Sequence, residues 1–274
     1  MFGALITGCA YFRSTPDFDT AVAERPSIAL LPFGIDRKIT TLSAVKSVDV
    51  KPSAEEEPRQ VAEALKDVLA DARWLFLSRL ATGQQFQFVP LEQTDAVAVE
   101  LGLKPGVLPT PEQLSELRRR LKADLVVAGN ILEYGRIRWQ WFVTGALAEL
   151  SVETVVIGLA SAWNPAIILA NVGVDVLVNS ALLLGGGYLF GIAFRPVVIE
   201  ARAFETVQGN PVWQSMEGAF YAWGTLKQLP EAERGKKESQ LRINLERAIE
   251  ALADSLNAAR LTVSQLATVA EVRR

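Results

Sequence analysis

The stretch Asp-Leu-Val-Val-Ala-Gly-Asn-Ile at residues 124–131 decides the fold. It is a short, nearly continuous apolar run without the 3.6-residue spacing of a helix, and such runs are typical of strands buried on both faces of a sheet. Residues 27–33 (SIALLPF) form a similar run that is closed by a proline, and residues 197–204 also have strand character. These three segments predict one sheet built from distant parts of the chain.

Helical segments separate the strands. Residues 59–80 carry apolar side chains on a single stripe and predict a long helix. Residues 95–101, 111–121 and 241–256 predict shorter helices, of which 111–121 begins with the capping-box residues Thr110 and Gln113. Residues 36–58 are polar and predict a surface loop, residues 86–90 predict a strand, and residues 206–214 predict the turn and second strand of a hairpin. This order predicts an α/β fold in which helices flank a mixed sheet.

Composition restricts the chemistry. The 274 residues include no histidine and one cysteine, and the formal net charge is −3. The first two facts exclude histidine-based catalytic triads, histidine metal sites, an internal disulfide and multi-cysteine zinc sites. The weak negative charge provides no global basic field for nucleic acid. We therefore expect no cofactor, no metal and no nucleic-acid partner.

Three sequence patterns could each indicate a catalytic or phosphate-binding site, but each also has a purely structural interpretation. Glu63, Asp67 and Asp71 lie four residues apart and could act as acid and base, but with Lys66 and Arg73 nearby we favour an ordinary solvated helix face. The arginines at 118–120 point in different directions around a helix, which favours solvent over a phosphate clamp. The glycines at 185–187 are not followed by Lys-Ser/Thr, which favours a helix end over a phosphate loop. We expect the protein not to be an enzyme.

Residues 6–9, Ile-Thr-Gly-Cys, resemble a bacterial lipobox, in which an aliphatic residue and two small residues precede a cysteine. In such signals the cysteine is acylated, with palmitate among the acyl groups, and becomes the mature N-terminus. No basic segment and only about five apolar residues precede Cys9, so we expect the native start to lie further upstream. The alternatives are an accidental match and a small buried thiol. Cys9 is the predicted lipidation site, residues 1–9 are the expected signal remnant, and residues 10–26 are the expected tether.

Residues 139–196 are predicted to form an inserted apolar helical hairpin. Only Glu149, Glu153 and Asp175 are charged between Arg138 and Arg195, and the uncharged runs 154–174 and 176–194 each match the length of about 20 residues that spans a bilayer. The Trp-Asn-Pro sequence at 163–165 predicts the tip of the hairpin. Aromatic and basic residues at its base are candidates for the membrane interface: Arg136, Arg138, Trp139, Trp141, Tyr188 and Arg195.

A polar stripe crosses this hairpin. Asn171, Asp175 and Asn179 share one face of the second helix, and Glu149 and Glu153 share one face of the first. Polar groups inside an apolar helix normally face protein or water, so the stripe predicts contact with a neighbouring helix or with the lumen of an oligomer. The alternative is a hairpin that is buried against its own domain or in a dimer.

Residues 123–135 (ADLVVAGNILEYG), 198–214 (VIEARAFETVQGNPVWQ) and 27–33 resemble a periplasmic lipoprotein domain. This domain is shared by the curli-secretion channel, the lipoprotein activators of peptidoglycan synthases and the N-terminal domain of the Tol-system propeller protein. The resemblance implies an anticodon-binding-domain-like fold and action through oligomerisation or partner binding. The curli channel inserts β-hairpins of alternating polarity at its membrane, whereas residues 139–194 do not alternate, so an α insertion is expected instead.

The expected organisation is an α/β domain at 27–138 and 197–260, the hairpin at 139–196 and a C-terminal tail at 261–274. The expected function is that of a non-enzymatic outer-membrane lipoprotein facing the periplasm. The outer membrane is preferred because Ala10 is not the aspartate associated with inner-membrane retention, and the inner membrane is the second choice. It would be an oligomeric structural component of an export (secretion) or envelope-assembly complex, with the bilayer and other envelope proteins as partners. The alternative is a monomeric lipoprotein regulator that binds a cell-wall or envelope enzyme.

Overall fold

A computed structural model describes residues 25–36, 38–50, 52–135, 188–189, 192–193, 195–219, 227 and 229–271. Cys9, all five residues of the polar stripe, Arg136, Arg138, Trp139 and Trp141 lie outside the described residues, so the assignments made for them stay predictions. In the part of the chain that is described, no helix has both the length and the hydrophobicity needed to cross a bilayer.

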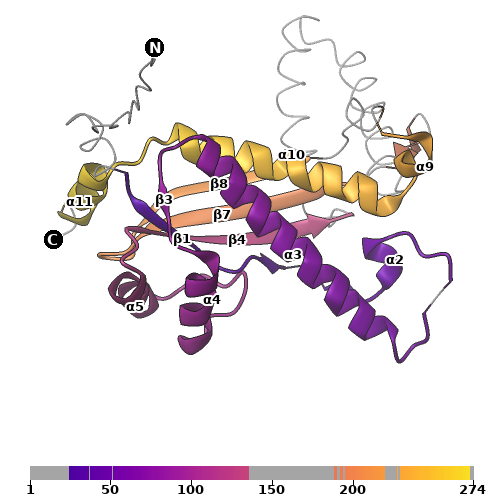
Figure 1. Cartoon of the computed structure of the whole chain (residues 1–274), viewed down its shortest axis with the longest axis horizontal. Helices are drawn as coiled ribbons and strands as arrows, with labels where there is room; N and C mark the ends of the chain where they lie inside the picture. The colour runs from indigo at the N-terminus through magenta and orange to yellow at the C-terminus, as the bar shows by residue number, and fades with distance from the viewer. Residues whose placement is uncertain are drawn as a thin grey trace, which may run out of the picture.

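A mixed sheet of six strands lies at the centre of the domain (Figure 1). Five strands follow the order β3 (Gln87–Phe88), β1 (Ser27–Leu30), β4 (Leu125–Tyr134), β7 (Val197–Glu205) and β8 (Pro211–Ala219), and β2 (Gly34–Ile35) pairs with β4. β1 runs parallel to β3 and β4, whereas β4, β7 and β8 are successively antiparallel. A separate pair is formed by β5 (Tyr188–Leu189) and β6 (Ile192–Ala193). The predicted α/β class with a mixed sheet is confirmed.

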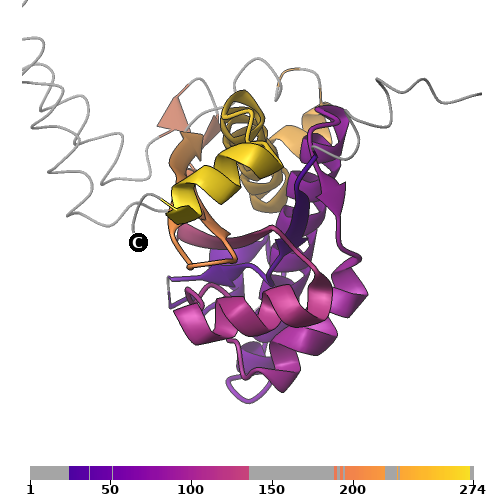
Figure 2. The ribbon, with the colours of Figure 1, turned by 90° about the vertical axis from the view of Figure 1, so that its left-hand side faces the viewer.

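Helices cover both faces of the sheet (Figure 2). α3 (Glu57–Thr82) and α10 (Lys237–Ala258) pack together on one face, with α2 (Leu42–Val45) against them. α4 (Leu91–Glu100) and α5 (Pro111–Leu121) lie on the other face. The remaining helices are α9 (Glu231–Arg234), next to α10, and α11 (Val263–Glu271), which places Leu266 in the core.

Alternate residues of the central strands supply two hydrophobic cores. Ile28 and Leu125 belong to the core beneath α3 and α10, whereas the next residue of each strand, Ala29 and Val126, belongs to the core against α4 and α5. Successive side chains of a strand point to opposite faces, so a strand covered on both faces needs apolar residues at every position. This is why residues 124–131 form a continuous apolar run.

Gly129 interrupts that run for a steric reason. A Cβ atom at this position would lie 2.5 Å from Cε1 of Phe33, which is closer than van der Waals contact permits. The Phe33 ring occupies this space and its centroid lies 5.8 Å from that of Phe76 on α3. The glycine therefore allows an aromatic pair to pack against the centre of β4.

The structure corrects several predicted boundaries. The expected loop at 36–58 contains α2 and the first residues of α3, and the helices predicted at 59–80, 95–101 and 241–256 all begin earlier, at residues 57, 91 and 237. The apolar stripe marks only the turns of a helix that face the core, and polar first turns extend beyond it. The capping box of α5 is confirmed, since Thr110 Oγ1 accepts the Gln113 N–H and Gln113 Oε1 accepts the Thr110 N–H.

The chain leaves the sheet and returns to it at neighbouring positions. Tyr134, the last residue of β4, is the register partner of Val197, the first residue of β7. The Gly135 N–H donates to the Pro196 carbonyl at 2.7 Å, directly beyond the ladder. The long sequence between these strands therefore begins and ends at one point of the domain.

Candidate functional site: a groove and an open sheet edge

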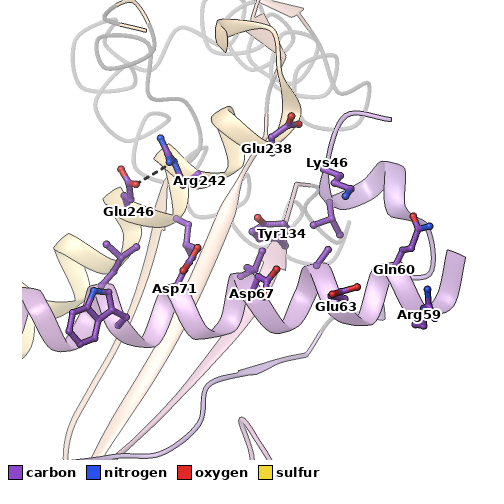
Figure 3. Close-up of a pocket in the computed structure, with 16 residues that line it drawn as sticks. Lys46, Arg59, Gln60, Glu63, Asp67, Asp71, Tyr134, Glu238, Arg242 and Glu246 are labelled. Atoms are coloured by element: carbon purple, nitrogen blue, oxygen red, sulfur yellow. Dashed lines mark ion pairs between the residues drawn. The ribbon is translucent and has the colours of Figure 1, made fainter. Parts of the chain in front are cut away.

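A groove of about 720 Å³ lies between α2, α3 and α10 (Figure 3). α3 supplies one wall, α10 supplies the other, and Lys46 at the end of α2 lies near Arg59 and Gln60 at one end. Tyr134 reaches the groove from the end of β4. The volume falls within the range of ~300–1,000 Å³ that is usual for ligand sites.

Charges on the two walls differ in their pairing. On the α10 wall, Arg242 pairs with Glu246 at 3.6 Å, and Glu238 accepts the Ser47 N–H at 2.7 Å. Burial acts to raise the pKa of Glu238, but hydrogen bonds from Ser47 outweigh it and hold this pKa below its usual value. On the α3 wall, the carboxylates of Glu63, Asp67 and Asp71 form no ion pair with any described residue.

Tyr134 lies at the middle of the groove with only 4% of its surface exposed. Its hydroxyl makes no hydrogen bond with the described residues, and its oxygen is accessible from the groove. Burial raises the pKa of Tyr134 well above its usual value, and the nearby Asp71 carboxylate raises it further. The hydroxyl therefore stays protonated and can both donate and accept a hydrogen bond.

The favoured sequence interpretation of this helix face is partly corrected. Glu63, Asp67 and Asp71 are exposed, as expected for a solvated face, but they also line the groove. Arg73 does not share that face: it is buried, donates to the Leu30 carbonyl at 2.5 Å and pairs with Asp95 at 2.6 Å. A helical stripe cannot reveal which distant elements pack beside it, so neither Tyr134 nor the α10 wall could be predicted from residues 59–80.

Two of the three arginines at 118–120 form ion pairs at the surface of the described structure. Arg119 pairs with Glu116 at 2.7 Å, and Arg120 pairs with Glu116 and Glu100. This arrangement matches the favoured solvated face. No three His, Cys, Asp or Glu side chains among the described residues are grouped so as to hold a metal ion.

The second candidate surface is the β8 side of the sheet. In the described residues β8 pairs only with β7, so its other edge carries unpaired backbone groups. Residues of β7 and β8 on the face away from α10 are half-buried or exposed, including Glu200, Arg202, Gln214 and Met216. Met216 is 48% exposed. This combination of a long edge and an open face can accept another chain.

Two of the predicted membrane-interface residues are described. Tyr188 begins β5, where its register partner is Ala193. Arg195 lies beside Tyr134 and Gly135 in a small polar pocket, and its carbonyl accepts the Asn244 side chain at 2.5 Å. Both positions are compatible with the base of an insertion, and their contact with a membrane stays a prediction.

Comparisons with known proteins give only distant likenesses. No family model matches the chain, and no curated protein matches it. Among solved structures, a lipoprotein from Neisseria meningitidis is 10% identical with a TM-score of 0.35, covering 84% of this chain and 99% of its own.

Two further solved structures resemble the domain at a similar level. A PelC dodecamer from Paraburkholderia phytofirmans is 12% identical with a TM-score of 0.35, covering 87% of this chain and 92% of its own. The C-terminal domain of LpoB from Salmonella enterica is 10% identical with a TM-score of 0.26, covering 72% and 83%. At these scores and identities the likenesses assign neither a family nor a function.

Proposed function

We propose that this protein is a non-enzymatic lipoprotein of the bacterial cell envelope, which works as an oligomeric structural component of an export or envelope-assembly complex. The open edge and face of β8 carry the proposal. An edge strand of nine residues offers a row of backbone donors and acceptors to a strand of another chain. Soluble domains normally cover or shorten such an edge, so its length supports a role in assembly.

Charge on this surface favours a second copy of the chain as the occupant. Glu200 and Arg202 lie 3.6 Å apart on β7, where their register partners are Met216 and Gln214. A surface that carries both signs around an apolar side chain can be complementary to itself, as a two-fold interface between identical copies requires. The runner-up is a monomeric regulator, in which the same edge binds a cell-wall or envelope enzyme.

Sequence features outside the described residues support the envelope location. The lipobox-like residues 6–9 and the 10–26 tether would attach the domain to the outer membrane from the periplasmic side. An apolar helical hairpin within 139–196, before the described β5–β6 pair, would add a second membrane contact beside Tyr134 and Arg195. We also propose that the α/β domain has an anticodon-binding-domain-like fold.

The mass of the full chain in detergent tests the assembly. We expect an oligomer for the wild type, and a shift toward the 29.9 kDa monomer for Met216→Lys, because a lysine would introduce charge into the self-association surface. Val99→Lys is the matched control, since Val99 is an exposed apolar residue on α4, away from β8. A monomeric wild type would contradict the oligomer and favour the regulator.

Acylation of Cys9 is tested separately. Cys9→Ala should move the full chain from the membrane pellet to the soluble fraction or leave an uncleaved precursor. Intact mass of wild-type protein from membranes should show the acyl groups. An unmodified Cys9 in that protein would remove the anchor from the proposal while leaving the assembly test intact.

A further inference from the structure

The groove between α3 and α10 plays no part in the proposed assembly. It lies on the face of the sheet that α3 and α10 cover, whereas the open face of β7 and β8 is on the opposite side, beyond α4 and α5. The groove is lined by acidic, basic and aromatic residues, and assembly through β8 does not involve them.

The spacing of charge along α3 is regular. Glu63, Asp67 and Asp71 are four residues apart, so their Cα atoms repeat about every 6 Å along the helix axis. None of the three pairs with a cation among the described residues. A ligand with positive groups at about the same interval would meet all three carboxylates.

Tyr134 adds a second and independent feature. Its side chain is 96% buried, yet its hydroxyl lines the groove beside Asp67 and Asp71 without a hydrogen-bond partner in the described structure. The hydroxyl oxygen is not one of the fully buried polar atoms that lack a partner, so it is accessible from the groove. A ligand that donates to the Tyr134 oxygen, as a guanidinium or ammonium group does, would give this hydroxyl the partner that the described residues do not provide.

The rest of the groove suits a long side chain with a cationic end. Val68, Leu75 and Leu245 give it apolar lining, against which methylene groups can lie. Trp74 follows Asp71 on α3, lines the groove and is 59% exposed, so its ring is open to a cation.

We propose that this groove binds a basic segment of a partner protein, with arginine or lysine side chains about 6 Å apart directed at Glu63, Asp67 and Asp71. Lys46 and Arg59 lie together at one end of the groove, and Trp74 lies about four turns further along α3. They favour an acidic residue or a C-terminal carboxylate at that end of the segment. The two signs of charge give the occupant a direction, which distinguishes a peptide from a simple polyamine.

Calorimetric titration of the full chain in detergent tests the proposal. The probe is a synthetic helical peptide with arginine at every fourth position and glutamate at one end. We expect saturable binding that weakens with salt, and a loss of about tenfold in affinity for the double variant Asp67→Asn/Asp71→Asn. Asp254→Asn is the matched control, because Asp254 is exposed on α10 and does not line the groove.

Tyr134→Phe provides the second arm. Because the hydroxyl has no partner in the free protein, its removal should weaken peptide binding without lowering the thermal midpoint of the domain. Three results would overturn the proposal: no binding by the wild type, equal affinity of the wild type and the double variant, or binding of spermidine as tight as that of the peptide. The mass measurements on Met216→Lys do not depend on this groove, so the two proposals fail independently.

Discussion

The two halves of one sheet differ in how they are covered. On β4 every residue except Asn130 is buried, because α3 and α10 cover one face and α4 and α5 cover the other. On β8 no residue is fully buried, since α10 covers a single face and the far edge is unpaired in the described chain. The half around β1 and β4, the covered half, therefore holds most of the buried core, whereas the β8 side, the open half, keeps an unpaired edge and an open face in the described chain.

β7 lies at the boundary between these halves. Val197, Ile199, Ala201 and Ala203 are buried toward α10, and the residues between them are half-buried on the other face. The pattern ends at Phe204, which joins the core against α5. The alternating sequence of this strand therefore marks where the second layer of helices stops.

The largest expected effect concerns the covered half. Ile131 is fully buried on β4, so Ile131→Ala should lower the free energy of unfolding by about 2–5 kcal/mol through lost burial and a residual cavity. Denaturant unfolding of the full chain measures this. A loss below about 0.5 kcal/mol, the range of surface substitutions, would show that β4 is not the centre of the core.

The next effect concerns the hydrogen bonds that hold the turn between β7 and β8. Glu205 is fully buried at the end of β7, and its carboxylate accepts the N–H groups of Val207, Gln208 and Asn210 in the hairpin turn. Glu205→Ala would leave these donors without that acceptor and should cost about 1.5–3 kcal/mol. Glu205→Gln, which keeps the shape and one acceptor oxygen, should cost less. Equal losses would mean that the charge and the second acceptor oxygen of Glu205 account for the effect, and that the side-chain packing kept by glutamine does not.

A smaller effect is expected at the start of α5, under the covered half. Thr110→Ala removes one side of the capping box and should destabilise the domain by about 1 kcal/mol. Thr110→Ser retains the hydroxyl and is the control, measured by thermal unfolding. A serine variant as unstable as the alanine variant would assign the loss to the Thr110 methyl group.

The smallest effect on stability is expected on the open face. Met216→Ala should change the free energy of unfolding by no more than about 0.5 kcal/mol, because the side chain is largely exposed on an edge strand. The same variant should still weaken self-association, measured as mass in detergent at several concentrations. A large loss of monomer stability would show that Met216 is packed in the core, and would contradict the difference in coverage between β4 and β8.

The sequence predicted the elements that are specified locally. The apolar run at 124–131 and the capping box at Thr110 and Gln113 were predicted correctly, because a buried strand and a helix start depend on neighbouring residues. The groove was not predicted, since it needs Tyr134 and α10 to approach α3 from positions far along the chain. The burial of Arg73 was missed for the same reason: its partners are Leu30 and Asp95 on other elements.

The pairing of Tyr134 with Val197 has a consequence for the speed of folding. β7 and β8 are joined by a short turn and form a local hairpin, whereas β4 and β7 meet only after the long intervening sequence has been closed into a loop. Closing a loop costs entropy before any contact compensates for it, and each doubling of loop length adds about 0.6 kcal/mol. Docking of the β7–β8 hairpin onto β4 is thus the expected slow step, and shortening the intervening sequence should accelerate it only modestly.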